Sequence, residues 1–202
     1  MQKLREHNEV ENKMKIFIIH GSYGNPHENW FPWLKKELEK LGHTVFVPEF
    51  PTPKNQNLKN WMFEFQNRRY YGLIDEKSVF VGHSLGPAFI LSVLEKIKIP
   101  KPVKACFFVS GFTGSLGNPE FDEINKTFTK KDFNWEKIKN SCDKFIMYHS
   151  DNDPYVPLEK AKELAKNLEG ELKIIKTAGH FNEKAGYSKF EDLLKNILKE
   201  TK

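Results

Sequence analysis

Short apolar segments alternate with stretches of helical spacing along most of this chain. Residues 16–19 form a continuous apolar run that ends at His20-Gly21, as is typical of a strand buried on both faces. Such alternation predicts an α/β fold, a three-layer sandwich in which helices cover both faces of a mostly parallel six-stranded sheet. Strands are predicted at residues 16–19, 44–47, 78–81, 103–109, 144–148 and 172–175, and helices at 30–41, 58–71, 87–97, 135–141, 158–168 and 190–198.

The length of 202 residues suits a single domain. Hydrophobic residues make up 39% of the chain and aromatic residues 13%, which excludes wholesale disorder. We expect residues 14–202 to form the domain, and residues 1–13, which are mostly polar, to be a flexible N-terminal extension. The segment 110–143 is too long for a simple connection, so it is predicted to be a small insertion over the site.

The charge pattern does not favour a nucleic-acid partner. The net charge is +5, but Arg5, Arg68 and Arg69 are the only arginines, and the lysines alternate with glutamates as on a solvated surface. Two cysteines, Cys106 and Cys142, cannot build a disulfide scaffold and suggest a reducing compartment. Apolar runs are far shorter than the roughly 20 residues of a membrane helix. We therefore expect a soluble, cytoplasmic protein without membrane contact.

The motif Gly82-x-Ser84-x-Gly86 lies between a predicted strand and a predicted buried helix. In this context the pattern describes a nucleophile elbow, a tight turn that projects the serine hydroxyl above the edge of the sheet. The glycines remove side chains that would collide with the strand and the helix. The backbone N–H of Leu85, at the start of the helix, would face negative charge that develops on a substrate oxygen.

A serine nucleophile needs a base, and the base needs an acid that orients it. In the elbow architecture these follow in the order Ser, Asp, His, each just beyond a strand. Asp153 follows the fifth predicted strand and His180 the sixth. Because the C-terminal ends of parallel strands meet at one edge, these residues can converge on Ser84. Asp151 is the alternative acid; we favour Asp153, which lies directly ahead of a Val-Pro turn.

Other histidines need their own interpretation. His20 ends the first strand and His83 precedes the nucleophile, so both are expected to shape the site through hydrogen bonds. His149 is expected to be a core residue. The alternative is that His149-x-Asp151-x-Asp153 coordinates a metal, but three ligands on one short strand end rarely point to one centre. We therefore expect no metal.

The loop at residues 20–24 follows the first predicted strand and contains Gly21 and Gly24. Such a loop can aim a backbone N–H at the oxygen that the Leu85 N–H addresses. We expect the donor to be Ser22, with Tyr23 as the alternative. The competing interpretation is an ordinary strand-to-helix turn.

Together these motifs resemble the α/β-hydrolase superfamily, and within it the small single-domain serine hydrolases of the YdeN and retinoblastoma-binding-protein-nine type. The resemblance implies a triad of Ser84, Asp153 and His180, no cofactor, and a compact fold without a large cap domain. It leaves the substrate open. The motifs that carry it lie at residues 18–21, 29–34, 82–86, 109–112, 153–157 and 179–181.

The expected chemistry is acyl transfer on a small ester, thioester or activated amide through an acyl-enzyme. As a hypothesis, aromatic side chains wall the acyl pocket together with the insertion; plain core packing is the alternative for each of them. The predicted pocket residues are Tyr23, Trp30, Phe112, Tyr155 and Phe181.

A second hypothesis comes from another functional class. A catalytically weak protein could use the same scaffold as an interaction module for a protein partner, because a fold alone does not determine function. The intact set of Ser84, Asp153 and His180 favours the enzyme, since a binding module would not need it.

Overall fold

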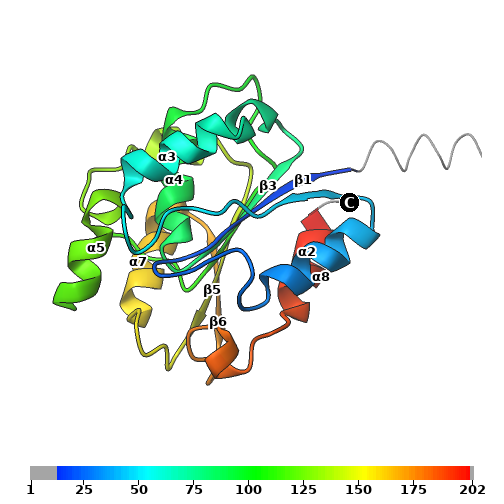
Figure 1. Cartoon of the computed structure of the whole chain (residues 1–202). Helices are drawn as coiled ribbons and strands as arrows, with labels where there is room; N and C mark the ends of the chain where they lie inside the picture. Colours follow the sequence, from blue (N-terminus) through cyan, green and yellow to red (C-terminus); the bar gives the residue numbers. More distant parts are fainter. Residues whose placement is uncertain (1–12, 201–202) are drawn as a thin grey trace, which may run out of the picture.

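Six parallel strands form one sheet at the centre of the molecule (Figure 1). The computed structural model describes residues 13–200. Every neighbouring pair in the strand order β2-β1-β3-β4-β5-β6 is parallel, which confirms the predicted six-stranded α/β fold. The strands are β1 (Lys15–Ile19), β2 (Thr44–Phe46), β3 (Ser78–His83), β4 (Ala105–Val109), β5 (Phe145–Ser150) and β6 (Glu171–Ile175).

Helices cover both faces of this sheet, because alternate residues of each strand point to opposite sides. In β1, Ile16 and Ile18 pack in the cluster that includes α2 and α8, while Phe17 and Ile19 pack in the cluster that includes α3, α4 and α7. Figure 1 shows these two groups of helices on opposite sides of the strands. The helices are α2 (Phe31–Lys40), α3 (Leu58–Asn67), α4 (Gly86–Lys96), α5 (Pro119–Thr129), α6 (Trp135–Lys139), α7 (Leu158–Leu168) and α8 (Glu191–Glu200), with 3-10 turns η1 (Tyr70–Leu73) and η2 (Glu183–Ala185).

The order of the strands brings two loops together at one point of the sheet. From β1 the chain passes outward to β2 and then returns to β3 on the other side of β1, where Ile19 pairs with Gly82. The segments that leave the C-terminal ends of β1 and β3 therefore start side by side. In open α/β sheets such a reversal of strand order is where ligands bind.

The helix predicted to be buried, α4, is apolar almost all round, and every residue from 86 to 94 is buried. It packs between the sheet and α3, α5 and α6, so its start is held firmly beneath the loop that precedes it. A firmly held helix start gives fixed positions to the backbone N–H groups at its first turn.

The segment 110–143 contains one helix more than predicted. Helix α6 lies within the predicted range 135–141, but α5 was not expected. Its start carries a standard signal: the side chain of Asn118 accepts hydrogen bonds from the N–H groups of Glu120 and Phe121, and Pro119 is the first helical residue. This helix packs against α4, on the side of the sheet that α3 and α7 also cover (Figure 1).

The predicted extension at residues 1–13 falls almost entirely outside the described residues, so its flexibility stays a prediction. Within residues 13–200, no helix is long and apolar enough to span a membrane.

Candidate active site

Ser84 lies on the tight turn between β3 and α4, with a left-handed φ of 57°. Non-glycine residues rarely adopt this conformation, and those that do concentrate at functional sites. The N–H of Ser84 donates to the carbonyl of Val109 (2.9 Å), so the turn stays tied to the sheet. A Cβ atom at Gly86 would lie 2.4 Å from the carbonyl oxygen of Ile19, so no larger residue fits where the helix begins. The strand and the helix predicted on either side of Ser84 are both present.

The loop after β1 lies directly against this turn. A Cβ atom at Gly21 would lie 2.7 Å from the Cβ of Ser84, so the bare backbone of the glycine packs on the serine. The N–H groups of Ser22 and Leu85 have no acceptor within residues 13–200. Two unpaired donors that flank a serine from adjacent loops are the arrangement that an oxyanion hole requires.

The backbone N–H of Tyr23 is less available as an oxyanion donor than that of Ser22. Its N–H donates to Thr52 Oγ1 (2.9 Å) and is therefore already engaged. Ser22 consequently remains the better candidate of the two donors considered for this loop. The side chains of both residues reach α5: Ser22 Oγ donates to Asn125 Oδ1 (2.6 Å) and the Tyr23 hydroxyl to Glu120 Oε1 (3.0 Å).

Gly21→Ala is expected to lower kcat/KM for ester hydrolysis by about 10²-fold, because the new methyl group would collide with Ser84 and displace an oxyanion donor. Gly72→Ala is the matched control, since a Cβ there meets nothing within 4 Å. Steady-state kinetics and thermal unfolding of both variants would test this. Equal activity in the two variants would contradict the close contact between Gly21 and Ser84.

The imidazole of His180 is bound to Asp153. Its Nδ1 lies 2.8 Å from Asp153 Oδ2 and 3.0 Å from Oδ1, which requires Nδ1 to carry the hydrogen when the carboxylate is ionised. The hydroxyl of Ser110 donates to Oδ2 (2.7 Å), and the N–H groups of Tyr155 and Val156 donate to Oδ1. Burial opposes ionisation of Asp153, but the hydrogen bond to His180, the positive charge that this imidazole can carry and the two backbone N–H donors outweigh it and hold the pKa of this carboxyl below its ordinary value.

The structure distinguishes between Asp151 and Asp153, the two candidates for the acid that orients the histidine. Asp151 Oδ1 accepts from the N–H of Thr177 (2.8 Å) and is exposed, whereas Asp153 is the one that contacts His180. Asp151 therefore closes a surface turn.

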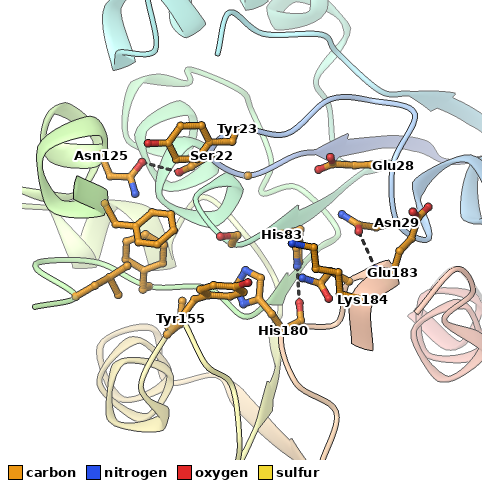
Figure 2. Close-up of a pocket in the computed structure, with 17 residues that line it drawn as sticks. Ser22, Tyr23, Glu28, Asn29, His83, Asn125, Tyr155, His180, Glu183 and Lys184 are labelled. Carbon is orange, nitrogen blue, oxygen red and sulfur yellow. Dashed lines mark hydrogen bonds between the residues drawn. The ribbon is translucent and has the colours of Figure 1, made fainter. Parts of the chain in front are cut away.

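Ser84 and His180 line one cavity of about 430 Å³ (Figure 2). Within the described part of the chain no hydrogen bond joins Ser84 Oγ to His180. Hydrogen bonds of this kind are often long in resting enzymes and tighten when substrate binds. The ring of Tyr155 packs edge-on against the imidazole, with centroids 5.0 Å apart.

Three of the five predicted pocket residues, Tyr23, Phe112 and Tyr155, line this cavity. Trp30 and Phe181 do not, and their prediction is corrected: both side chains are fully buried on the α2 and α8 side of the sheet. The indole N–H of Trp30 donates to the carbonyl of Phe181 (3.0 Å).

The ring of Phe181 stacks on Phe190 with centroids 5.2 Å apart. Trp30 and Phe181 therefore support the loop that carries His180 from the α2 and α8 side of the sheet, and neither lines the cavity.

The far end of the cavity is polar. Glu28, Asn29 and the segment 182–184 line it, on the opposite side from Tyr155 and Asn125 (Figure 2). The N–H of Glu183 donates to Asn29 Oδ1 (3.1 Å), which joins the two loops. Burial raises the pKa of Glu28, and the negative charge of Glu183 adds to this effect.

Ser110, Asn125 and Glu28 were missed by the sequence analysis. Asn125 lies on α5, whose start at Asn118-Pro119 was a readable signal. Ser110 lies in the motif at residues 109–112, but no role was assigned to its hydroxyl; it follows β4 in a left-handed conformation (φ 50°) and reaches Asp153 from a different strand.

The two histidines expected to shape the site do form hydrogen bonds there. His83 Nε2 donates to the carbonyl of His180 (2.8 Å), and His20 Nδ1 donates to the carbonyl of Gly21 (2.8 Å). His20 Nε2 accepts from the N–H of Phe50, so His20 is neutral in this arrangement. Burial, aided by the positive charge that His180 can carry, lowers the pKa of His83 to about 3.

Acid is therefore expected to destabilise the protein through His83. Below its unfolded pKa of 6.5, the unfolded chain binds a proton at this imidazole and the folded protein does not until about pH 3, so the free energy of unfolding falls as pH drops. By pH 5 the loss amounts to about 2 kcal/mol. Urea unfolding of His83→Gln should show a loss between pH 7 and pH 5 that is smaller by this amount. Asp153, whose pKa is lowered, loses its contribution only below about pH 4, outside this window.

An identical loss in the wild type and in His83→Gln would contradict the neutral, buried state of this imidazole.

His149 is a core residue, as expected, but only one of its nitrogens is bonded. Its Nε2 donates to the carbonyl of Val156 (2.9 Å), whereas Nδ1 is buried without a partner among the described residues. No group of three or more potential metal-ligating side chains occurs within residues 13–200.

Comparisons with known proteins identify the family to which the chain is similar. Residues 16–199 match the family described as serine hydrolase. YdeN of Bacillus subtilis, named as a hydrolase, is 32% identical over 174 residues, which cover 86% of this chain and 89% of that protein. The serine hydrolase RBBP9 of Rattus norvegicus is 27% identical over 186 residues, 91% of this chain and 93% of its own. The crystal structure of the B. subtilis ydeN product has a TM-score of 0.87 at 29% identity, and the match covers 93% of this chain and 98% of that chain.

Proposed function

The chain belongs to the serine hydrolase family, among the small α/β hydrolases related to YdeN and RBBP9, and from this premise we propose that it cleaves small carboxylic esters, thioesters or activated amides through Ser84, His180 and Asp153. One observation carries the proposal. His180 is bound through Nδ1 to Asp153 and lines the same cavity as Ser84, which is held at a strained turn.

In the first step His180 Nε2 takes the hydroxyl proton of Ser84 while Oγ forms a bond to the carbonyl carbon of the substrate. Asp153 keeps the hydrogen on Nδ1, so Nε2 is the nitrogen that is open to accept the proton. Once the imidazole is charged, the carboxylate stabilises it. Ser110 and two backbone N–H groups keep the carboxylate in place.

The negative charge that forms on the carbonyl oxygen is stabilised by the N–H groups of Ser22 and Leu85. Packing holds both donors in place. Gly21 packs against Ser84 and so positions the N–H of Ser22, and the start of α4 positions the N–H of Leu85. His180 then donates its proton to the leaving group, and the bond between the carbonyl carbon and the leaving group breaks.

Water completes the cycle. It attacks the acyl-enzyme as His180 removes its proton, and the bond to Ser84 Oγ breaks with return of a proton to the serine. The reaction needs no cofactor, because nucleophile, base and electrostatic stabilisation all come from the chain. We also propose that it takes place in the cytoplasm, because the only two cysteines, Cys106 and Cys142, are no basis for a disulfide scaffold.

A fluorophosphonate probe tests the proposal directly. Attack by an activated serine joins Oγ to phosphorus and releases fluoride. We expect one equivalent of label on the wild-type protein, mapped to Ser84 by peptide mass, and no label on Ser84→Ala. His180→Ala should label far more slowly, because it lacks the base.

Absence of label on a folded wild-type protein would overturn the proposed activity. It would favour the alternative hypothesis of an interaction module that uses this scaffold.

A further inference from the structure

We propose that Asn125 selects acyl groups that carry an oxygen acceptor, by donating a hydrogen bond to that oxygen from its side-chain nitrogen. This inference rests on the acyl transfer proposed above. Asn125 lies on α5, is 1% exposed, and lines the cavity that holds Ser84. It touches no reacting atom in this role, so it is a specificity-determining residue and not a catalytic one.

A backbone group sets the orientation of the Asn125 amide. The N–H of Tyr23, which can only donate, lies 2.9 Å from Thr52 Oγ1 and 3.4 Å from Gln56 Oε1. The oxygen of Gln56 faces this N–H and also accepts from the Thr52 hydroxyl, so its nitrogen points the other way. There Gln56 Nε2 donates to Asn125 Oδ1 (2.9 Å), which also accepts from Ser22 Oγ (2.6 Å).

The nitrogen of Asn125 is consequently turned away from this network. Figure 2 shows the side-chain oxygen joined to Ser22 and the nitrogen on its other side. No residue between 13 and 200 accepts a hydrogen bond from this nitrogen. A nearly buried amide with a saturated oxygen and an unpaired nitrogen at a cavity is prepared for an acceptor from a ligand.

The position of Asn125 assigns it to the acyl half of the cavity. His180 must protonate the leaving group, and residues 182–184, two to four positions further along the chain, line the polar end together with Glu28. Asn125 lies on the opposite side of the cavity, beside Ser22 (Figure 2). That half also contains Phe121, whose ring packs edge-on against Tyr155 with centroids 6.0 Å apart. The acyl group therefore meets aromatic walls and, beside them, the side-chain nitrogen of Asn125 as a hydrogen-bond donor.

This arrangement discriminates between acyl groups of equal length. A plain alkyl chain would remove water from the Asn125 nitrogen without replacing the hydrogen bond. An acyl group with an oxygen at the right position would replace it. A buried donor left unpaired in the complex typically costs a factor of about ten to a hundred in kcat/KM.

Matched pairs of p-nitrophenyl esters test the inference. The 4-oxopentanoate, 5-oxohexanoate and 6-oxoheptanoate esters are compared with the pentanoate, hexanoate and heptanoate esters. Each kcat/KM is divided by the hydroxide-catalysed rate constant of the same ester, which corrects for intrinsic reactivity. We expect the wild-type protein to favour the oxo ester by tenfold or more in at least one pair.

Asn125→Asp separates the two functions of the side chain. The carboxylate keeps an oxygen that accepts from Ser22 and Gln56, but an acceptor replaces the nitrogen that faces the cavity. The preference for the oxo ester should fall about tenfold. Asn118→Asp is the matched control: it makes the same change at the cap of α5, whose side chain binds Glu120 and Phe121 N–H groups, and it should keep the preference.

The ratio of the corrected kcat/KM values for two esters, measured on one protein preparation, does not depend on the fraction of protein molecules that are active. Each result therefore has one interpretation. Equal corrected constants in all three wild-type pairs would overturn the role of Asn125 and leave the hydrolase intact. The same would follow from an unchanged ratio in Asn125→Asp. Failure to hydrolyse any of the six esters would instead refute the proposed function, and this inference with it.

Discussion

Replacement of Ser84 with alanine is expected to lower kcat for p-nitrophenyl ester hydrolysis by about 10⁶-fold. The hydroxyl oxygen forms the covalent bond to the acyl carbon, and no neighbouring group can take its place without moving. Alanine meets the same strain as serine at φ 57°, so the free energy of unfolding should change little. Residual activity should come from the N–H groups of Ser22 and Leu85, which still stabilise a developing oxyanion.

Ser92→Ala is the matched control for this experiment. Ser92 is also buried, but it lies further along α4 and its hydroxyl donates to the carbonyl of Ala88 (3.1 Å), outside the cavity. Its removal should leave kcat within a factor of about two or three. Comparable activity in Ser84→Ala and the wild type, with wild-type contamination excluded by mass spectrometry, would refute the assignment of the nucleophile.

Asp153→Asn is expected to lower kcat by about 10⁴-fold. The amide can present an N–H to His180 Nδ1 where the carboxylate presents an acceptor. The imidazole would then carry its hydrogen on Nε2, the nitrogen that has to take the Ser84 proton. The new side chain has the same size, so the loss should fall on kcat at every pH and should not arise from unfolding.

Asp151→Asn makes the identical change two residues earlier. Because Asp151 accepts from Thr177 N–H in a surface turn and does not contact His180 within residues 13–200, kcat should stay within about threefold of wild type. A reversal, with Asp151→Asn inactive and Asp153→Asn active, would mean that the loop at residues 151–157 rearranges before catalysis.

The elements around Ser84 were predictable because local sequence specifies them. A glycine-flanked serine after an apolar strand and before an apolar helix leaves few other structures for the chain. Parallel strands then carry Asp153 and His180 to the same edge, whatever lies between them in sequence. The resemblance to small serine hydrolases read from these motifs is confirmed by the comparisons.

The walls of the cavity were less predictable, because they depend on which side of the sheet a side chain faces. Trp30 and Phe181 stand beside motif residues in the sequence, yet both point into the layer under α2 and α8. Asn125 looks like an ordinary polar residue of an amphipathic helix. It acquires its place only when α5 packs over the loop that carries Ser22.

The acid that contacts His180 was only partly predictable from the sequence. The sequence narrowed the choice to Asp151 and Asp153, and a turn favoured the second. The hydroxyl of Ser110, which helps to hold that carboxylate, comes from the end of β4, and no residue near it in the sequence indicates this contact with Asp153. Contacts that join the ends of different strands become visible only in three dimensions.

The hydrogen bonds between α5 and the loop at residues 20–24 have a consequence for how substrate range can change among related enzymes. One helix both lines the proposed acyl half of the cavity and holds Ser22 and Tyr23 through Asn125 and Glu120. Substrate range and turnover are therefore coupled traits. Exchange of the 110–143 segment with that of a relative would replace two features at once: the α5 residues that line the cavity and the α5 residues that bind Ser22 and Tyr23. Chimeras should recover activity only when residues 20–24 are exchanged with it.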